Sequence, residues 1–272
     1  MGTVNKVGVV GAGRMGLPII GHLARKGFAV VVHDANGEKR AVIEGLGAVW
    51  AADAASLARS SEVVLVCVGY DREVQDLLGP DGALRAAARG TIVAVLSTVL
   101  PKTVQALAAA GESSGIEVID STVCRGGAAA DDGTLLSFVG GSPEQVERVR
   151  PVLAAYSSDI VHTGAIGSAQ VAKAANNLIL WACLVADHEG LALAQRYGLD
   201  PEVLRKALAM SSCANGPLDK WGTQSMAWAE DDLVIVGEMA NDVGLALPQA
   251  GLVREICRAM KPRRYQLEAY GR

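Results

Sequence analysis

The sequence predicts an α/β protein with a doubly wound parallel sheet, followed by a long helix and an all-helical second domain. In the first part of the chain, short runs rich in β-branched residues alternate with stretches of helical spacing, which is typical of right-handed βαβ units. The alternation stops after His162, and no further strand is expected beyond it. We therefore predict an α/β domain over residues 1–163 and a helical domain for substrate binding and oligomerisation over residues 164–272.

Seven apolar runs are predicted strands: residues 7–10, 29–33, 62–68, 91–96, 117–119, 135–139 and 159–162. The stretches with helical spacing between them are residues 15–26, 37–44, 71–78, 101–110 and 143–155. From about residue 165 to 197 no turn signal interrupts the pattern, which predicts a helix about 45 Å long. Further helices are expected from Pro201, over 233–247 and over 250–260, before a polar tail.

Composition excludes several classes of function. The net charge is −4 and both signs are spread along the chain, so we expect no nucleic-acid or membrane-surface partner. The longest apolar stretch, residues 177–187, is too short to cross a bilayer. The five cysteines are odd in number and none lies in a CxxC pair, which favours a reducing cytoplasm and indicates neither disulfides nor a metal site.

A glycine-rich turn is the strongest local signal. Gly11, Gly13 and Gly16 form a GxGxxG pattern directly after a predicted strand and at the start of a predicted helix. This is the dinucleotide-binding pattern of Rossmann domains, in which free N–H groups at the helix start face the phosphates. Asp34 ends the second strand, near the spacing at which a carboxylate meets the adenosine ribose. An ordinary glycine turn with a surface aspartate is the less favoured alternative.

Asp34 also bears on the choice of cofactor. A carboxylate there would accept hydrogen bonds from the ribose hydroxyls and repel a 2′-phosphate, so we expect NAD rather than NADP. Lys39 and Arg40 could soften that preference, although solvated charges on the next helix are the favoured interpretation. We expect the end of the third predicted strand to pass close to the adenosine or its ribose, through Cys67, Val68 and Gly69.

Four motifs in register carry a resemblance that covers most of the chain. Arg14 and Met15 complete the glycine turn, Ser97 and Thr98 follow a strand, and residues 120–127 form a loop that precedes residues 133–135 and 139–141. The fourth motif contains Gly164, Gly167, Lys173, Asn176 and Asn177. Together these motifs resemble the β-hydroxyacid dehydrogenase family, which includes 3-hydroxyisobutyrate dehydrogenases and tartronate semialdehyde reductases.

The resemblance implies a fold and a chemistry. It implies a Rossmann domain joined by a long helix to a helical domain, with the active site in the cleft between them, and hydride transfer between NAD and a small hydroxy or oxo acid. Lys173 matches the lysine that acts as general acid and base, and Asn177, four residues later on the same helical face, could orient it or bind the substrate oxygen. Small or apolar neighbours of Lys173 argue against a solvated surface lysine. By the same resemblance, Ser97 and Thr98 contact the nicotinamide side of the cofactor.

Two departures from the family pattern concern the substrate. The substrate loop reads Cys124, Arg125, Gly126 where the family usually has Ser-Gly-Gly, and Asp231 stands where the family often has a lysine. Arg125 could grip a substrate carboxylate, or it could pair with Asp131 or Asp132 nearby; we weigh the two equally. Cys124 is expected to contact substrate or pack.

Further expectations concern the helical domain and the competing functions. Asn215 could reach the substrate or cap a turn. The long apolar helix makes a homodimer or homotetramer plausible. The alternatives are an imine reductase of the same architecture, against which Lys173 argues, and a non-catalytic NAD-binding sensor, against which the pairing of Lys173 with Asn177 argues.

Overall fold

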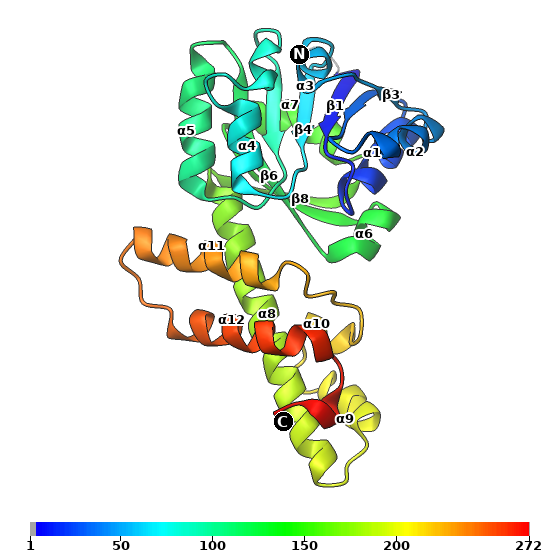
Figure 1. Cartoon of the computed structure of the whole chain (residues 1–272), viewed down its shortest axis with the longest axis vertical. Coiled ribbons are helices and arrows are strands. Elements are labelled where there is room, and N and C mark those ends of the chain that lie inside the picture. Colours follow the sequence, from blue (N-terminus) through cyan, green and yellow to red (C-terminus); the bar gives the residue numbers. More distant parts are fainter. Residues whose placement is uncertain (1–3, 272) are drawn as a thin grey trace. The chain divides into compact units, whose positions relative to one another are not determined.

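The computed structural model describes residues 4–271, and the chain divides into two compact units, residues 1–173 and 174–272. The division falls inside one long helix, α8 (Ser168–Arg196), drawn as a continuous ribbon in Figure 1. The first turn of α8 belongs to the α/β unit because the backbone N–H of Gln170 is bound by a carboxylate of the sheet, that of Asp120.

The α/β unit is built on one sheet of eight strands in the order β3-β2-β1-β4-β5-β6-β7-β8. The strands are β1 (Lys6–Val10), β2 (Ala29–His33), β3 (Val49–Trp50), β4 (Val63–Val66), β5 (Ile92–Val95), β6 (Glu117–Cys124), β7 (Leu135–Gly140) and β8 (Ser157–Gly164). All neighbouring strands are parallel except β6 and β7. The first six follow the Rossmann order 3-2-1-4-5-6, whose switch point between β1 and β4 is where such sheets bind dinucleotides. The predicted fold class is confirmed.

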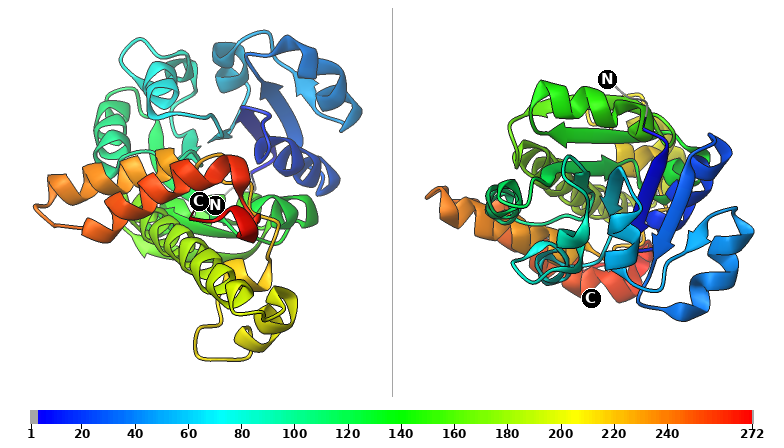
Figure 2. Two further views of the ribbon diagram at one scale, coloured as in Figure 1. Left: turned by 60° about the horizontal axis from the view of Figure 1, so that its bottom comes forward. Right: turned by 90° about the horizontal axis from the view of Figure 1, so that it is seen from above.

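Helices cover both faces of this sheet, as Figure 2 shows. The helices are α1 (Gly16–Arg25), α2 (Arg40–Gly45), α3 (Ala54–Arg59), α4 (Asp71–Leu78), α5 (Pro101–Glu112), α6 (Gly126–Asp132) and α7 (Pro143–Leu153), with 3₁₀ turns at Gly37–Lys39 and Ala83–Ala86. Along β4 the apolar side chains alternate: Val63 and Leu65 pack in one core cluster and Val64 and Val66 in the other. Burial on both faces explains why these strands read as continuous apolar runs.

Three elements of the α/β unit differ from the expectation. The two-residue strand β3 and the six-residue helix α3 lie in a stretch for which no element was expected, although Asp53 caps α3 by accepting from the N–H of Ser56. Helix α6 was not expected either, because Gly126 and Gly127 at its start are poor helix formers. Short elements of this kind depend on tertiary contacts more than on local propensity.

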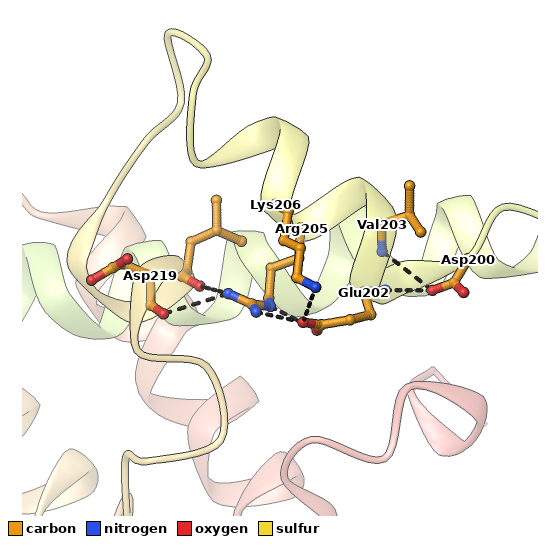
Figure 3. Close-up of polar contacts among 7 residues, drawn as sticks. Asp200, Glu202, Val203, Arg205, Lys206 and Asp219 are labelled. Carbon is orange, nitrogen blue, oxygen red and sulfur yellow. Dashed lines mark hydrogen bonds and ion pairs between the residues drawn. The ribbon is translucent and has the colours of Figure 1, made fainter.

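The second unit is helical throughout its described residues. It contains the rest of α8, then α9 (Pro201–Leu208), α10 (Gly216–Asp219), α11 (Ala229–Asp242) and α12 (Pro248–Met260), with 3₁₀ turns at Lys261–Arg263 and Leu267–Ala269. The Asp200 carboxylate caps α9, and Arg205 pairs with Glu202 and donates to the carbonyl oxygen of Leu218 (Figure 3). Leu267 is buried, so this part of the polar tail is packed.

Helix α8 is longer than the apolar stretch read from the sequence. Among the described residues it is the one helix that is long and apolar enough, by length and composition, to cross a membrane, which is weak evidence because long core helices of soluble proteins meet the same test. One side of α8 is packed: Trp181 and Leu184 lie in a core cluster with Leu233 and Val253.

Candidate active site

The glycine turn between β1 and α1 is shaped by steric necessity at two positions. Gly11 has a φ of +96°, and a Cβ on it would lie 2.2 Å from the carbonyl oxygen of Cys67. A Cβ on Gly16 would lie 2.1 Å from the carbonyl oxygen of Gly11. Gly13 has nothing within 4 Å of its Cβ position. The turn therefore needs glycine at both ends and is open in the middle, where a pyrophosphate would approach the backbone.

Arg14 and Met15 follow Gly13 in the turn. Both terminal nitrogens of the Arg14 guanidinium donate to the carboxylate of Asp131 in α6, at 2.8 and 2.7 Å. This two-pronged ion pair is exposed on both sides and holds the pKa of Asp131 below its usual range. Met15 precedes α1 and packs against the core cluster of the sheet. The turn is thus tied to the helix that follows the substrate loop, a contact that the sequence did not indicate.

Asp34 lies at the end of β2 and is 9% exposed. Its Oδ2 accepts from the N–H of Ala12 at 2.7 Å and from Lys39 Nζ at 2.9 Å, and its Oδ1 accepts from the N–H of Asn36 at 2.8 Å. Burial alone would raise the pKa of Asp34, but the hydrogen bonds from Lys39, Ala12 and Asn36 outweigh it and lower the pKa. Asp34 is therefore a carboxylate at neutral pH. Arg40, by contrast, pairs with Glu44 on the surface.

The ends of β4 and β5 are joined by a serine. Ser97 Oγ accepts from the N–H of Val68 at 3.0 Å and donates to the carbonyl oxygen of Val68 at 2.9 Å. Burial raises the pKa of the neighbouring Cys67 thiol to about 12, so Cys67 stays protonated at neutral pH. Gly69 and Thr98 follow these strands at the same edge of the sheet. Parallel strands end at a common edge, so both segments lie where a dinucleotide would cross.

Lys173, in the first part of α8, is half-buried. Its Nζ donates to the carbonyl oxygen of Val123 at 2.8 Å and lies 4.0 Å from Cys124 Sγ, both at the end of β6. A surface lysine would have its ammonium in water, whereas this one is held at the carboxyl edge of the sheet. The α/β unit therefore brings Lys173 and the substrate loop together, and the cofactor turn shares that edge.

Arg125 adopts a left-handed backbone conformation with a φ of +85°. An L-residue there costs about 1–2 kcal/mol, which explains why a glycine suits this position of the family loop. Its Nη1 donates to Asp159 Oδ2 at 2.7 Å, to Ser158 Oγ at 2.8 Å and to the carbonyl oxygen of Thr134 at 3.0 Å. The expected acidic partners, Asp131 and Asp132, are wrong: the partner is Asp159 on β8.

The two asparagines predicted for the site belong to the second unit. Asn177 continues α8 one turn after Lys173, is buried, and its Oδ1 accepts from Asn176 Nδ2 at 3.0 Å. Asn215 precedes α10 and caps it, because its Oδ1 accepts from the N–H of Leu218, and its Nδ2 donates to Asp187 Oδ1 at 2.9 Å. The structure thus gives Asn215 a capping role.

The residues of this site carry the features of a dinucleotide-binding site. Within residues 4–271 no three His, Cys, Asp or Glu side chains gather as a metal-binding group. The open backbone at Gly13 and the buried carboxylate of Asp34 are the features that a pyrophosphate and a ribose need. Gln170, which the sequence analysis did not single out, and Asp120, which it gave only as the first residue of the third motif, also lie here and join α8 to the loop after β5 and to β6.

Comparisons with known proteins agree with this geometry. Residues 6–164 match the family model of the NAD binding domain of 6-phosphogluconate dehydrogenase, and residues 167–268 match that of the NAD-binding region of NADP-dependent 3-hydroxyisobutyrate dehydrogenase. The chain is 33% identical to a 3-hydroxyisobutyrate dehydrogenase of Pseudomonas aeruginosa over 256 residues, covering 91% of this chain and 86% of that protein. It is 32% identical to an NAD-dependent L-serine dehydrogenase of the same organism over 254 residues, covering 89% and 84%.

A solved structure shares the fold over nearly the whole chain. The 3-hydroxyisobutyrate dehydrogenase of Mycobacterium tuberculosis, solved with L-serine, superposes with a TM-score of 0.87 at 23% identity, covering 96% of this chain and 95% of that one. The two matching family models together reach from residue 6 to residue 268. The chain therefore belongs to the 3-hydroxyisobutyrate dehydrogenase-like β-hydroxyacid dehydrogenases, a family of NAD(P)-binding oxidoreductases.

Proposed function

We propose that this protein transfers a hydride between NAD and a small hydroxy acid, or carries out the reverse reduction of the oxo acid, with Lys173 as the general acid and base. The observation that supports it best is the position of the Lys173 amine, which lies at the carboxyl edge of the sheet against Val123 and Cys124. That edge also carries the turn with Gly11 and Gly13.

The chemistry needs a proton acceptor beside the alcohol. The bound dinucleotide supplies the hydride acceptor or donor. Lys173 takes the hydroxyl proton in oxidation and returns it in reduction, and this requires a neutral amine for the oxidative direction. Its bond to the Val123 carbonyl oxygen fixes the amine without giving it a counter-charge. Asn177, one turn later on the same helix, orients Lys173 or binds the substrate oxygen in this proposal.

The substrate is proposed to be small and to bear a carboxylate. Cys124, Arg125 and Gly126, the proposed substrate loop, run from the last residue of β6 to the first residue of α6, beside Lys173. Arg125 Nη1 donates to Asp159, Ser158 and Thr134, and Nη2 and Nε of the same guanidinium are the atoms proposed to bind a carboxylate. Asn215 is proposed as a further substrate contact only in a conformation that releases it from Asp187.

The cofactor is proposed to be NAD rather than NADP. Glycines 11, 13 and 16, with Arg14 and Met15, form the phosphate turn, and the segments 67–69 and 97–98 follow the strands on the other side of the switch point. Asp34 is ionised and buried, which disfavours a 2′-phosphate.

The protein is proposed to work as a homodimer or homotetramer in the cytoplasm. On α8 the side chains of Ile179, Leu193 and Tyr197 are 63%, 60% and 82% exposed. With Ala186 and Gly190 they fall at helical spacing on one face that carries no charge. An apolar face of this kind marks an interaction surface, and a second copy of the chain is the proposed occupant. All five cysteines lie within the described residues and none forms a disulfide bond, which agrees with the proposed reducing compartment.

Replacing Lys173 tests the proposal. Lys173→Met keeps the length of the side chain and removes the amine, so kcat should fall by about 10² to 10⁴-fold while NADH binding changes little. NADH absorbance over a panel of hydroxy acids gives turnover, and NADH fluorescence gives binding. Lys26→Met, at a surface lysine after α1, is the matched control. Full turnover by Lys173→Met would refute the role of Lys173.

A further inference from the structure

Asp120 is a fully buried carboxylate in the middle of β6. Its Oδ1 accepts from the N–H of Gly167 at 2.8 Å and its Oδ2 accepts from the N–H of Gln170 at 2.9 Å. These N–H groups lie at the start of α8, where a helix has unsatisfied donors and a positive end. Asp120, a residue of the sheet, therefore caps the helix that carries Lys173. It lies 50 residues before Gln170 in the sequence.

The Asp120 side chain is closely packed against the neighbouring strand β7. Burial raises the pKa of Asp120, while the N–H groups of Gly167 and Gln170 act in the opposite direction. A Cβ on Gly140, which pairs with Asp120 across β6 and β7, would lie 2.3 Å from Asp120 Oδ1. A buried carboxylate without hydrogen bonds would be costly, so this cap has to stay formed in the native state.

Gln170 connects the same helical turn to the loop after β5. Its side chain is buried, its Oε1 accepts from the N–H of Val99 at 3.0 Å, and its Nε2 donates to the carbonyl oxygen of Ser97 at 2.9 Å. Ser97 in turn holds Val68 at the end of β4 through its hydroxyl. One chain of buried and partly buried hydrogen bonds thus runs from the end of β4 through the loop after β5 to the first turn of α8.

We propose that Asp120 and Gln170 are positioning residues for Lys173. They fix the first turn of α8 to the ends of β4, β5 and β6, so that the amine one turn later lies at a set distance from the loop at Ser97 that borders the cofactor. This inference rests on the proposed role of Lys173 in proton transfer. Neither side chain needs to touch substrate or cofactor, since both act through the placement of α8.

Replacing Gln170 separates positioning from folding. Gln170→Met keeps the size of the side chain and removes both hydrogen bonds to the loop. We expect kcat to fall by about 10- to 100-fold, with KM and the NADH dissociation constant within about threefold of wild type, since a misplacement near 1 Å costs that much. The primary deuterium isotope effect on kcat should rise, because the chemical step becomes slower relative to product release.

Gln105→Met is the matched control. Gln105 Nε2 donates to the carbonyl oxygen of Ile166, just before α8, from the exposed side of α5, so its loss removes a bond to the same segment without touching the loop at Ser97. Gln105→Met should behave as wild type. Equal kcat in the two variants would overturn the inference. So would a loss of activity in Gln170→Met that merely follows the folded fraction, with an unchanged isotope effect.

A measurement without turnover keeps the inference separate from the proposed function. Acetic anhydride labels lysine amines, and mass spectrometry gives the rate at Lys173 relative to Lys26. In Gln170→Met this ratio should change several-fold, whatever the substrate is, and an unchanged ratio would contradict positioning. Absence of turnover in the wild type with every hydroxy acid would instead overturn the proposed function. If Gln170→Met does not fold, Gln170→Ala removes the same two hydrogen bonds without adding a charge and is judged by the same readouts.

Discussion

Lys39 donates from its ammonium to Asp34 Oδ2 at 2.9 Å, so the carboxylate expected to select NAD is already paired with a cation of the same chain. The Lys39 side chain is 35% exposed and lines one groove with Gly13 and Arg14. A carboxylate repels a 2′-phosphate, whereas an ammonium beside it attracts one. We therefore expect discrimination between NAD and NADP at this site to depend on Lys39 as well as on Asp34.

Replacing Lys39 should sharpen the preference for NAD. In Lys39→Ala the charge of Asp34 is no longer neutralised, so the ratio of the NADPH to the NADH dissociation constant should rise by about tenfold, equivalent to about 1.4 kcal/mol. Fluorescence titration with the two reduced cofactors measures this ratio at fixed ionic strength. Arg40→Ala is the control, because Arg40 pairs with Glu44 instead of Asp34. An unchanged ratio in Lys39→Ala would show that Lys39 has no part in cofactor choice.

His188 should make the helical unit less stable in mild acid. It is buried, its Nδ1 donates to the carbonyl oxygen of Leu184 at 2.7 Å, and its Nε2 accepts from the N–H of Tyr265 at 3.0 Å. Burial lowers the pKa of His188, so below about pH 6.5 the unfolded chain binds a proton that the native state does not. The free energy of unfolding should then fall by up to about 1.4 kcal/mol per pH unit.

Proton NMR of the imidazole C–H signals, together with urea denaturation at pH 7.5 and 5.5, checks this prediction. The site-resolved signal matters because burial raises the pKa of the neighbouring Asp187, which acts in the opposite direction as the pH falls. The midpoint of the His188 signal should lie below the ordinary value near 6.5, because burial lowers its pKa. An ordinary titration midpoint near 6.5 would contradict the buried neutral imidazole.

The parts of the fold that depend on local sequence pattern could be predicted from the sequence. The strands on either side of the switch point are apolar runs, and the turn at Gly11 needs glycine for reasons of backbone geometry alone. The long helix was recognisable because nothing interrupts it. Lys173 was predicted from the motif around it. Composition and helical spacing alone cannot distinguish a catalytic lysine from one whose methylene groups only pack against the core.

The partners of the charged residues could not be predicted from the sequence. Arg125 pairs with Asp159, 34 residues away, because Cys124, Leu136 and Asp159 lie in one row across β6, β7 and β8, and the arginine after Cys124 reaches across β7. Arg14 pairs with Asp131 across 117 residues. Helix α6 was missed for a local reason, because it begins with Gly126 and Gly127, which are poor helix formers. Gln170 carried only a weak signal, as a polar residue one turn before Lys173.

The exposed face of α8 should control assembly. Ile179→Asp or Leu193→Asp places a charge in the apolar face formed with Tyr197, and burying an unpaired carboxylate in an interface is unfavourable. Light scattering should show a smaller species than the wild type. Met210→Asp, at a side chain that is 85% exposed and follows α9, is the control and should leave the mass unchanged. A wild-type mass in both α8 variants would contradict this face as the interface.

The role of Arg125 can be determined by comparing variants of the two partners in the ion pair between Arg125 and Asp159. If its free nitrogens bind the substrate carboxylate, Arg125→Ala should raise KM for a hydroxy acid by about tenfold or more and leave KM for the matching alcohol without a carboxylate unchanged. Asp159→Asn removes the charged anchor but keeps the guanidinium, so it should preserve the selectivity for the acid. If Arg125 only ties β6 to β8, the two variants should lose activity alike toward both compounds, because each breaks the same contact. Steady-state kinetics with the hydroxy acid and the matching alcohol decides between these outcomes. Asp132→Asn is the control, because it removes an exposed carboxylate in α6 near Arg125 without touching the ion pair.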